Sequence, residues 1–223
     1  MTRNIAKTLI ALRRLRRRAV RVDTVRLWAF AVIIGVAASY GVIGFRLLID
    51  GVSIIAFGQT EEAVASGAER LSFGRAWAAP VAAGLAVSAI LYLADKSKWL
   101  PDGRGQGVAE VIEARAVRDG RISIRSGVAA AAVSAISLGG GASAGREGPA
   151  VHIGATIASA IDRYIGCSAK DRRTLLGCGA AAAVAASFNA PIAGVIFALE
   201  VVLGNYALSV FGPIAAASAA SVL

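Results

Sequence analysis

The sequence predicts an all-α membrane protein with tilted and broken transmembrane helices. Its 223 residues are 57% hydrophobic, with a mean hydropathy of +0.66. Apolar blocks long enough to cross a bilayer recur along the chain; they cover residues 27–45, 76–94, 127–144, 175–197 and 207–223. Gly and Pro interrupt several blocks, which favours half-helices over uniform spans. A soluble Ala-rich bundle is the alternative, but residues 129–138 lack the polar face that its helices need.

The expected elements follow from these blocks and their interruptions. A helix starting at Asp23 exceeds one bilayer thickness and is expected to tilt. Glycines 139–141 break the chain before a half-helix that opens at Glu147, and Phe188-Asn-Ala-Pro191 reverses it later. The expected helices cover residues 2–18, 23–57, 77–93, 108–116, 122–138, 147 onward, 175–187, 192–203 and 206–223.

The net charge of +10 is compatible with nucleic-acid binding, but its distribution argues against that class. Nine Lys and Arg residues precede the first span, and more lie at 115–125 and 163–173, whereas the 59–75 loop holds three Glu residues against two Arg residues. Such asymmetry predicts a cytoplasmic N-terminus in a multi-pass protein of the cell membrane. Residues 1–22 form a basic cytoplasmic segment that can lie on anionic lipid, and residues 23–223 form the transmembrane region.

The segment Gly145-Arg146-Glu147-Gly148-Pro149 is the main candidate site. It places two ionisable residues between apolar stretches that contain no charged residue. Ionisable groups at membrane depth are costly and usually functional. Pro149 suits the first turn of a helix, and the glycines allow a sharp turn. A helix N-terminus carries partial positive charge and unpaired N–H donors. The segment therefore predicts an anion site that contains a titratable acid.

A second candidate is the loop Gly103-Arg-Gly-Gln-Gly107, which precedes a short helix. Its glycines can point backbone donors at a cavity. The G-x-G-x-x-G spacing and the βαβ context of a dinucleotide loop are absent. A plain flexible connector is the alternative interpretation.

The remaining polar residues indicate neither an enzyme nor a cofactor protein. No nucleophile–base arrangement appears, and Cys167 and Cys178 lack metal-binding spacing. His152, three residues past Pro149, is interpreted as a packing or hydrogen-bonding residue rather than a proton carrier. We therefore expect no enzymatic activity, no cofactor and no metal.

Together these motifs resemble the CLC family of chloride channels and proton–chloride antiporters. Gly145 to Pro149, followed by Val151-His-Ile-Gly154, is similar to the second selectivity-filter motif of that family. Residues 177–197 are similar to the helical pair that follows it, and Gly105-Gln-Gly-Val-Ala-Glu110 corresponds to the first filter segment. The resemblance covers roughly residues 35–223.

The resemblance implies the first of two inverted repeats and voltage- or pH-gated chloride transport. Glu147 would be the gating glutamate, because its carboxylate competes with chloride for the same N–H donors. The complete protein would be a homodimer in lipid. The resemblance assigns the anion-binding role to eight residues: Gly105, Gln106, Gly107, Val108, Gly145, Arg146, Gly148 and Pro149.

Two departures from the family pattern bear on selectivity and coupling. Many members have Ser where this chain has Gln106, and Pro where it has Ala109. Antiporters often carry an internal proton-accepting Glu where this chain has Val201, which cannot titrate. Glu200 is turned about 100° away on the helix, and we expect a basic partner for it. Channel-like transport is therefore the first hypothesis, and proton-coupled antiport is the alternative.

The chain resembles only one repeat, so the third filter segment and a chloride-coordinating Tyr have no counterpart in it. We expect either a truncated sequence or a separate second half, because Leu223 ends within an apolar run. A non-transporting assembly half and a carrier of nitrate or fluoride are further alternatives.

Overall fold

The computed structural model describes residues 24–61, 63–64, 72–97 and 107–222, and it forms helices without β-strands over these residues. The basic segment expected at residues 1–22 lies outside this part. The elements are α2 (Thr24–Phe57), α4 (Phe73–Lys96), α5 (Val108–Val117), α6 (Ile124–Gly139), α7 (Glu147–Ile165), α8 (Ala169–Phe188), α9 (Pro191–Phe197), the π-helical turn η2 (Ala198–Leu203) and α10 (Leu208–Ala220). The predicted all-α fold is confirmed.

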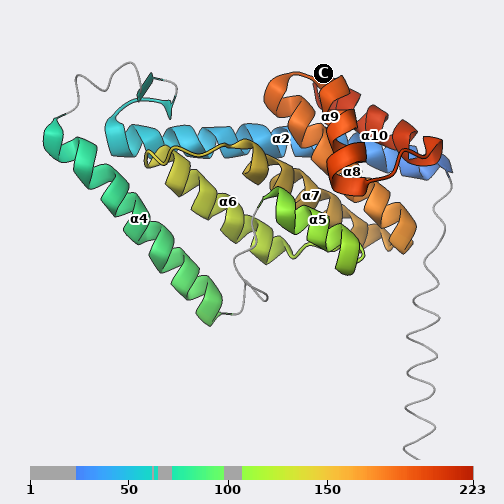
Figure 1. Ribbon diagram of the computed structural model, residues 1–223, viewed down its shortest axis with the longest axis horizontal. Helices are drawn as coiled ribbons and strands as arrows, with labels where there is room; N and C mark the ends of the chain where they lie inside the picture. The colour runs from blue at the N-terminus through green and yellow to red at the C-terminus, as the bar shows by residue number, and fades with distance from the viewer. Residues whose placement is uncertain (1–23, 62, 65–71, 98–106, 223) are drawn as a thin grey trace, which may run out of the picture.

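The long helix α2 runs along the whole assembly, and the other helices are arranged along it (Figure 1). Helix α4 diverges at one end, whereas α8, α9 and α10 gather at the other end. Helix α8 is the centre of the packing, since it contacts α2, α7, α9 and α10. Almost every residue from 172 to 185 is buried.

Small residues allow the helices around α8 to approach closely. A Cβ atom added at Gly154 of α7 would collide with the carbonyl oxygen of Gly179 in α8, and the reverse is also true. Gly35 of α2 meets the backbone of Ala217 in α10 in the same way. Such backbone contact is typical of membrane helices, where packing of small residues replaces the hydrophobic effect.

The apolar blocks do not all become full spans. Only α2 and α4 are long and apolar enough to cross a membrane, among the residues that the structure describes. Helix α6 has 16 residues and α10 has 13, and the block at 175–197 divides between α8 and α9. The physical cause is local, because Asn189 takes a left-handed conformation and Pro191 opens the next helix.

Helix α4 is exposed along almost its whole length. Ala94 is its only buried residue, and the aromatic and aliphatic side chains of Phe73, Trp77, Leu85 and Tyr92 are exposed. An apolar helix with no buried stripe is expected to face hydrocarbon or another protein surface rather than water. This exposure agrees with the predicted membrane setting.

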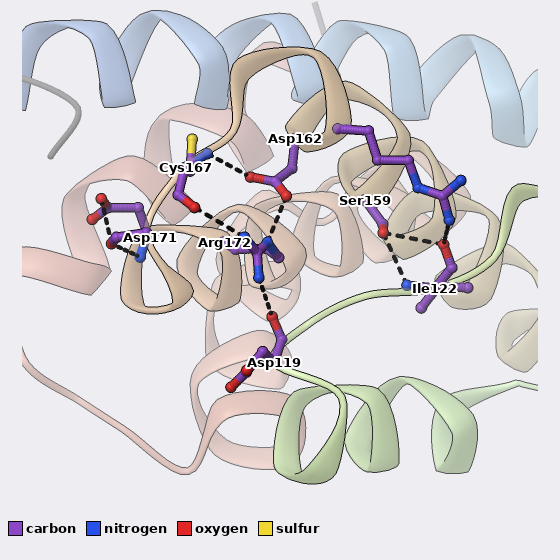
Figure 2. A network of polar contacts seen from close by, with 9 residues as sticks. Asp119, Ile122, Ser159, Asp162, Cys167, Asp171 and Arg172 are labelled. Atoms are coloured by element: carbon purple, nitrogen blue, oxygen red, sulfur yellow. Dashed lines mark hydrogen bonds and ion pairs between the residues drawn. The ribbon is translucent and has the colours of Figure 1, made fainter. Parts of the chain in front are cut away.

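A buried ion pair fixes the turn between α7 and α8 (Figure 2). The Asp162 carboxylate lies 2.5 Å from Nε of Arg172, and it also accepts a hydrogen bond from the N–H of Cys167 at 3.2 Å. Arg172 donates to the carbonyl oxygens of Cys167 at 2.9 Å and Asp119 at 3.4 Å. Arg172 therefore ties the α7–α8 turn to the α5–α6 turn. Arg172 is thus a buried structural group, whereas the charge distribution of the sequence placed it among the basic residues that predict the membrane orientation.

The α5–α6 turn is also joined to helix α7 itself (Figure 2). The hydroxyl of Ser159 accepts from the N–H of Ile122 at 2.9 Å and donates to its carbonyl oxygen at 3.2 Å. Arg163 donates to the same carbonyl oxygen at 2.9 Å. Satisfying both backbone groups of Ile122 allows this loop residue to be buried, and it fixes the end of α5 against α7.

Candidate functional site

The turn before α7 has the predicted form. Helix α6 ends at Gly139, Gly141 takes a φ of +98°, and α7 begins at Glu147. The first backbone bond of α7 runs from the N–H of Ala150 to the carbonyl oxygen of Arg146 at 3.1 Å. The N–H groups of Glu147 and Gly148 precede that bond and have no acceptor within the helix. Pro149, in the first turn, has no N–H to leave unpaired. The broken helix with an open N-terminus is confirmed.

The Glu147 side chain is exposed and folds back over the turn. Its Oε2 atom lies over Gly145, at the place where a Cβ atom of that residue would stand. Glu147 makes no ion pair or side-chain hydrogen bond with the residues that the structure describes. A carboxylate that nothing holds in place, next to open N–H donors, can move toward or away from those donors.

The side chain of Arg146 is paired with a carboxylate. Its Nη1 atom lies 3.4 Å from Oε2 of Glu61, which follows the end of α2. Both side chains are about one-third exposed, so the pair contributes little to stability. The guanidinium of Arg146 is therefore paired with the Glu61 carboxylate. Only the main chain of Arg146 lies at the N-terminus of α7.

The first predicted filter segment meets this turn. Gly107 precedes α5 with φ +80° and ψ −151°, a backbone conformation that is essentially restricted to glycine. A Cβ atom there would lie 3.6 Å from the backbone of Gly148, an ordinary van der Waals distance, so the two glycines face each other with room for little more than a methyl group between them. Two segments far apart in the sequence thus place helix N-termini side by side. Val108 opens α5, whereas Gly105 and Gln106 lie outside the described residues.

A buried polar contact between α5 and α7 was not expected from the sequence. Oε2 of Glu110 lies 3.2 Å from Nε2 of His152, and both side chains are almost fully buried. Their spacing is a signal that could have indicated the contact. Glu110 lies three residues after Gly107, and His152 lies four residues after Gly148. On facing helices, these positions are one turn from the glycine contact.

The position assigned to the internal proton acceptor lies in η2. Val201 and Glu200 are both exposed on this π-helical turn. Glu200 has no ion pair or hydrogen bond with any residue in the described part of the chain, so the expected basic partner is absent from that part. Arg115 of α5 donates to the carbonyl oxygen of Leu203 and so fixes the end of η2. π-Helical turns occur frequently at functional sites.

The residues that the structure describes contain no group of three or more His, Cys, Asp or Glu side chains that could hold a metal ion. Cys167 and Cys178 are both free and buried.

Comparison with known proteins places the chain in a family. The model of the family described as "Voltage gated chloride channel" matches residues 83–223. A protein of Ralstonia nicotianae named "Putative chloride channel protein ClcB-like" is 35% identical over 190 residues, which are 83% of this chain and 43% of the relative. "H(+)/Cl(-) exchange transporter ClcA" of Citrobacter koseri is 40% identical over 108 residues, which are 46% of this chain and 22% of the relative.

A solved structure shares the fold. It is described as "Crystal Structure of a eukaryotic CLC transporter" and matches with a TM-score of 0.64 at 20% identity, covering 89% of this chain and 37% of that chain. The chain spans less than half the length of the relatives that it matches. The chain belongs to the voltage-gated chloride channel family, known as the CLC family, and is a membrane protein with the CLC fold.

Proposed function

We propose that this chain supplies one repeat of a voltage- or pH-gated chloride transporter in which Glu147 is the gate. One observation carries the proposal. The Glu147 carboxylate has no partner among the described residues and lies at the open N-terminus of α7, where the N-terminus of α5 meets it through Gly107 and Gly148. A carboxylate and chloride are both anions, so they compete for the same N–H donors.

The anion-binding residues of the proposal are Gly105, Gln106, Gly107, Val108, Gly145, Gly148 and Pro149, together with the main chain of Arg146. Backbone N–H groups of the two helix openings would coordinate chloride, and no metal or cofactor takes part.

Chloride efflux from liposomes tests the gate in the complete protein that carries this repeat. Glu147→Gln resembles the protonated gate, so it should raise chloride flux and remove most of its pH dependence. Glu113→Gln is the matched control, because Glu113 is an exposed glutamate of α5 and the change removes the same charge. If Glu147→Gln keeps the rate and the pH dependence of the parent, the gate assignment is wrong.

We further propose that transport is channel-like, with proton-coupled antiport as the alternative. Val201 cannot carry a proton at the position of the internal acceptor, which favours passive chloride movement. A relative named as a proton–chloride exchanger supports the alternative. The reversal potential in combined chloride and pH gradients distinguishes them. A value at the chloride Nernst potential supports the channel, whereas a shift with the pH gradient that Glu147→Gln abolishes supports antiport.

The working unit would be a homodimer of the complete protein in the cell membrane, with the N-terminus of this chain in the cytoplasm. A repeat alone leaves half-helix ends and apolar faces such as that of α4 without partners. Unpaired backbone groups at membrane depth cost several kcal/mol each. We therefore expect the chain to need a second repeat. This expectation would be contradicted if the chain alone were monodisperse in detergent and conducted chloride after reconstitution. If the complete protein passes no anion, a non-transporting assembly role is favoured instead.

A further inference from the structure

The contact between Glu110 and His152 lies directly beneath the proposed anion site. Glu110 is on the first turn of α5 and is 5% exposed, and His152 is on α7 and is 1% exposed. Their Oε2 and Nε2 atoms are 3.2 Å apart. One helical turn above the pair, Gly107 and Gly148 face each other and allow the two helix N-termini to lie close together. The pair and the glycines are therefore two levels of one α5–α7 interface.

Each of the two atoms depends on the other for a polar partner. Oε2 and Nε2 are within ion-pair distance but are not aligned for a hydrogen bond, and neither is hydrogen-bonded to any other part of the described chain. The nearest other charge is Nη2 of Arg118, which lies 3.7 Å from the second carboxylate oxygen. The pair is therefore an electrostatic contact between two buried polar atoms, and separating the helices would take this polar neighbour from each of them.

The surrounding charges lie toward solvent. Arg118 also contacts Glu113 at 3.4 Å on the exposed side of α5. Glu147, at the start of α7, is exposed, and so is Glu200 on η2, which packs against α5. Within the described residues, Glu110 and His152 are thus the buried polar side chains that join α5 to α7 across the interface.

We propose that Glu110 and His152 form a positioning unit that sets chloride affinity by holding the N-termini of α5 and α7 close together. The proposal rests on chloride binding at these helix openings. Neither side chain needs to touch the ion. The pair acts through the glycines, because α5 is a short rigid helix and a shift at Glu110 moves Gly107 and its N–H groups with it. Donors fixed in position bind an anion better than donors that must first be ordered.

A double-mutant cycle in the complete protein tests the proposal, with the half-saturating chloride concentration of liposome flux as the readout. A side chain that serves only folding would change the amount of active protein, and hence the maximal flux, without changing half-saturation. His152→Leu and Glu110→Met each remove one partner and should each raise half-saturating chloride about tenfold, a change of about 1.4 kcal/mol. The double variant should resemble the single variants, because the two side chains act as one unit.

A conservative variant provides the rescue. Nε2 of glutamine is as many bonds from Cβ as Nε2 of histidine, so His152→Gln keeps a polar nitrogen within reach of Glu110 and should keep half-saturation within about twofold of the parent. Glu113→Gln, with the same charge change on the exposed side of α5, should leave it unchanged. If His152→Leu yields no folded protein, His152→Asn makes the same test. The amide nitrogen of asparagine is one bond closer to Cβ than Nε2 of histidine, so it falls short of Glu110.

The outcomes separate the two proposals. A parent protein that passes no chloride contradicts the proposed function. A parent that passes chloride, with His152→Leu and Glu110→Met at parental half-saturation, contradicts only the positioning unit. The positioning unit is also contradicted if the double variant raises half-saturating chloride by the product of the two single increases. Equal half-saturation for His152→Asn and His152→Gln would contradict it as well.

Discussion

The ion pair of Asp162 and Arg172 permits a stability prediction with an internal control. The two side chains are only 5% and 8% exposed, and their charged atoms are 2.5 Å apart. Asp162→Asn keeps the size of the side chain but leaves the Arg172 guanidinium as a buried charge without a counter-ion. Removing one partner of a buried pair destabilises proteins by about 3–5 kcal/mol.

Thermal unfolding of the purified protein in detergent measures the effect. In chains of 150–250 residues, 1 kcal/mol corresponds to about 2–4 °C in Tm. The relative from Ralstonia nicotianae is more than twice as long as the matched segment, so each kcal/mol shifts the Tm of a complete protein by less, and Asp162→Asn should lower it by about 5 °C. The amide oxygen of Asn can still accept from the N–H of Cys167, so the effect isolates the loss of the charge that faces Arg172.

The neighbouring pair of Asp119 and Arg173 is the matched control. It has a similar separation of 2.7 Å, but its side chains are 57% and 43% exposed. Exposed pairs contribute about 0–1 kcal/mol, so Asp119→Asn should change Tm by no more than about 3 °C. Asn also tolerates the positive φ of 51° at this position. If the two substitutions lower Tm equally, burial does not govern the strength of these pairs and the reasoning is wrong.

Two further predictions concern the backbone and a thiol. Gly107→Ala should destabilise the protein by about 1–3 kcal/mol, because a φ of +80° is costly for alanine. The control is Gly84→Ala in α4, where a Cβ atom has open space, and it should leave Tm unchanged or raise it. Equal changes in Tm for the two variants would contradict the strain argument. Burial and the Asp162 carboxylate raise the pKa of Cys167 to about 12, so at pH 8 its thiol stays protonated. Maleimide should label Cys167 only after unfolding, and rapid labelling of the native protein would refute this.

The sequence predicted the helix order and the main turns because those signals are local. Gly and Pro mark the break before Glu147 and the reversal at Asn189, and the structure has both where they were expected. The family and the CLC fold were also recognisable from the motif around Glu147. The gating and anion-binding roles stay predictions, and Gly105 and Gln106 lie outside the described residues.

By itself, the sequence determined which residues turn the chain and which segments are apolar, since backbone preference and hydropathy belong to each residue and its near neighbours. Only the tertiary structure decided which helices meet. Separate helices are joined by the close approach of Gly107 to Gly148, by the pairing of Glu110 with His152 and by the buried ion pair of Arg172. These contacts depend on packing geometry, because a side chain is exposed or buried, and paired or unpaired, only through the surface that the rest of the chain places against it.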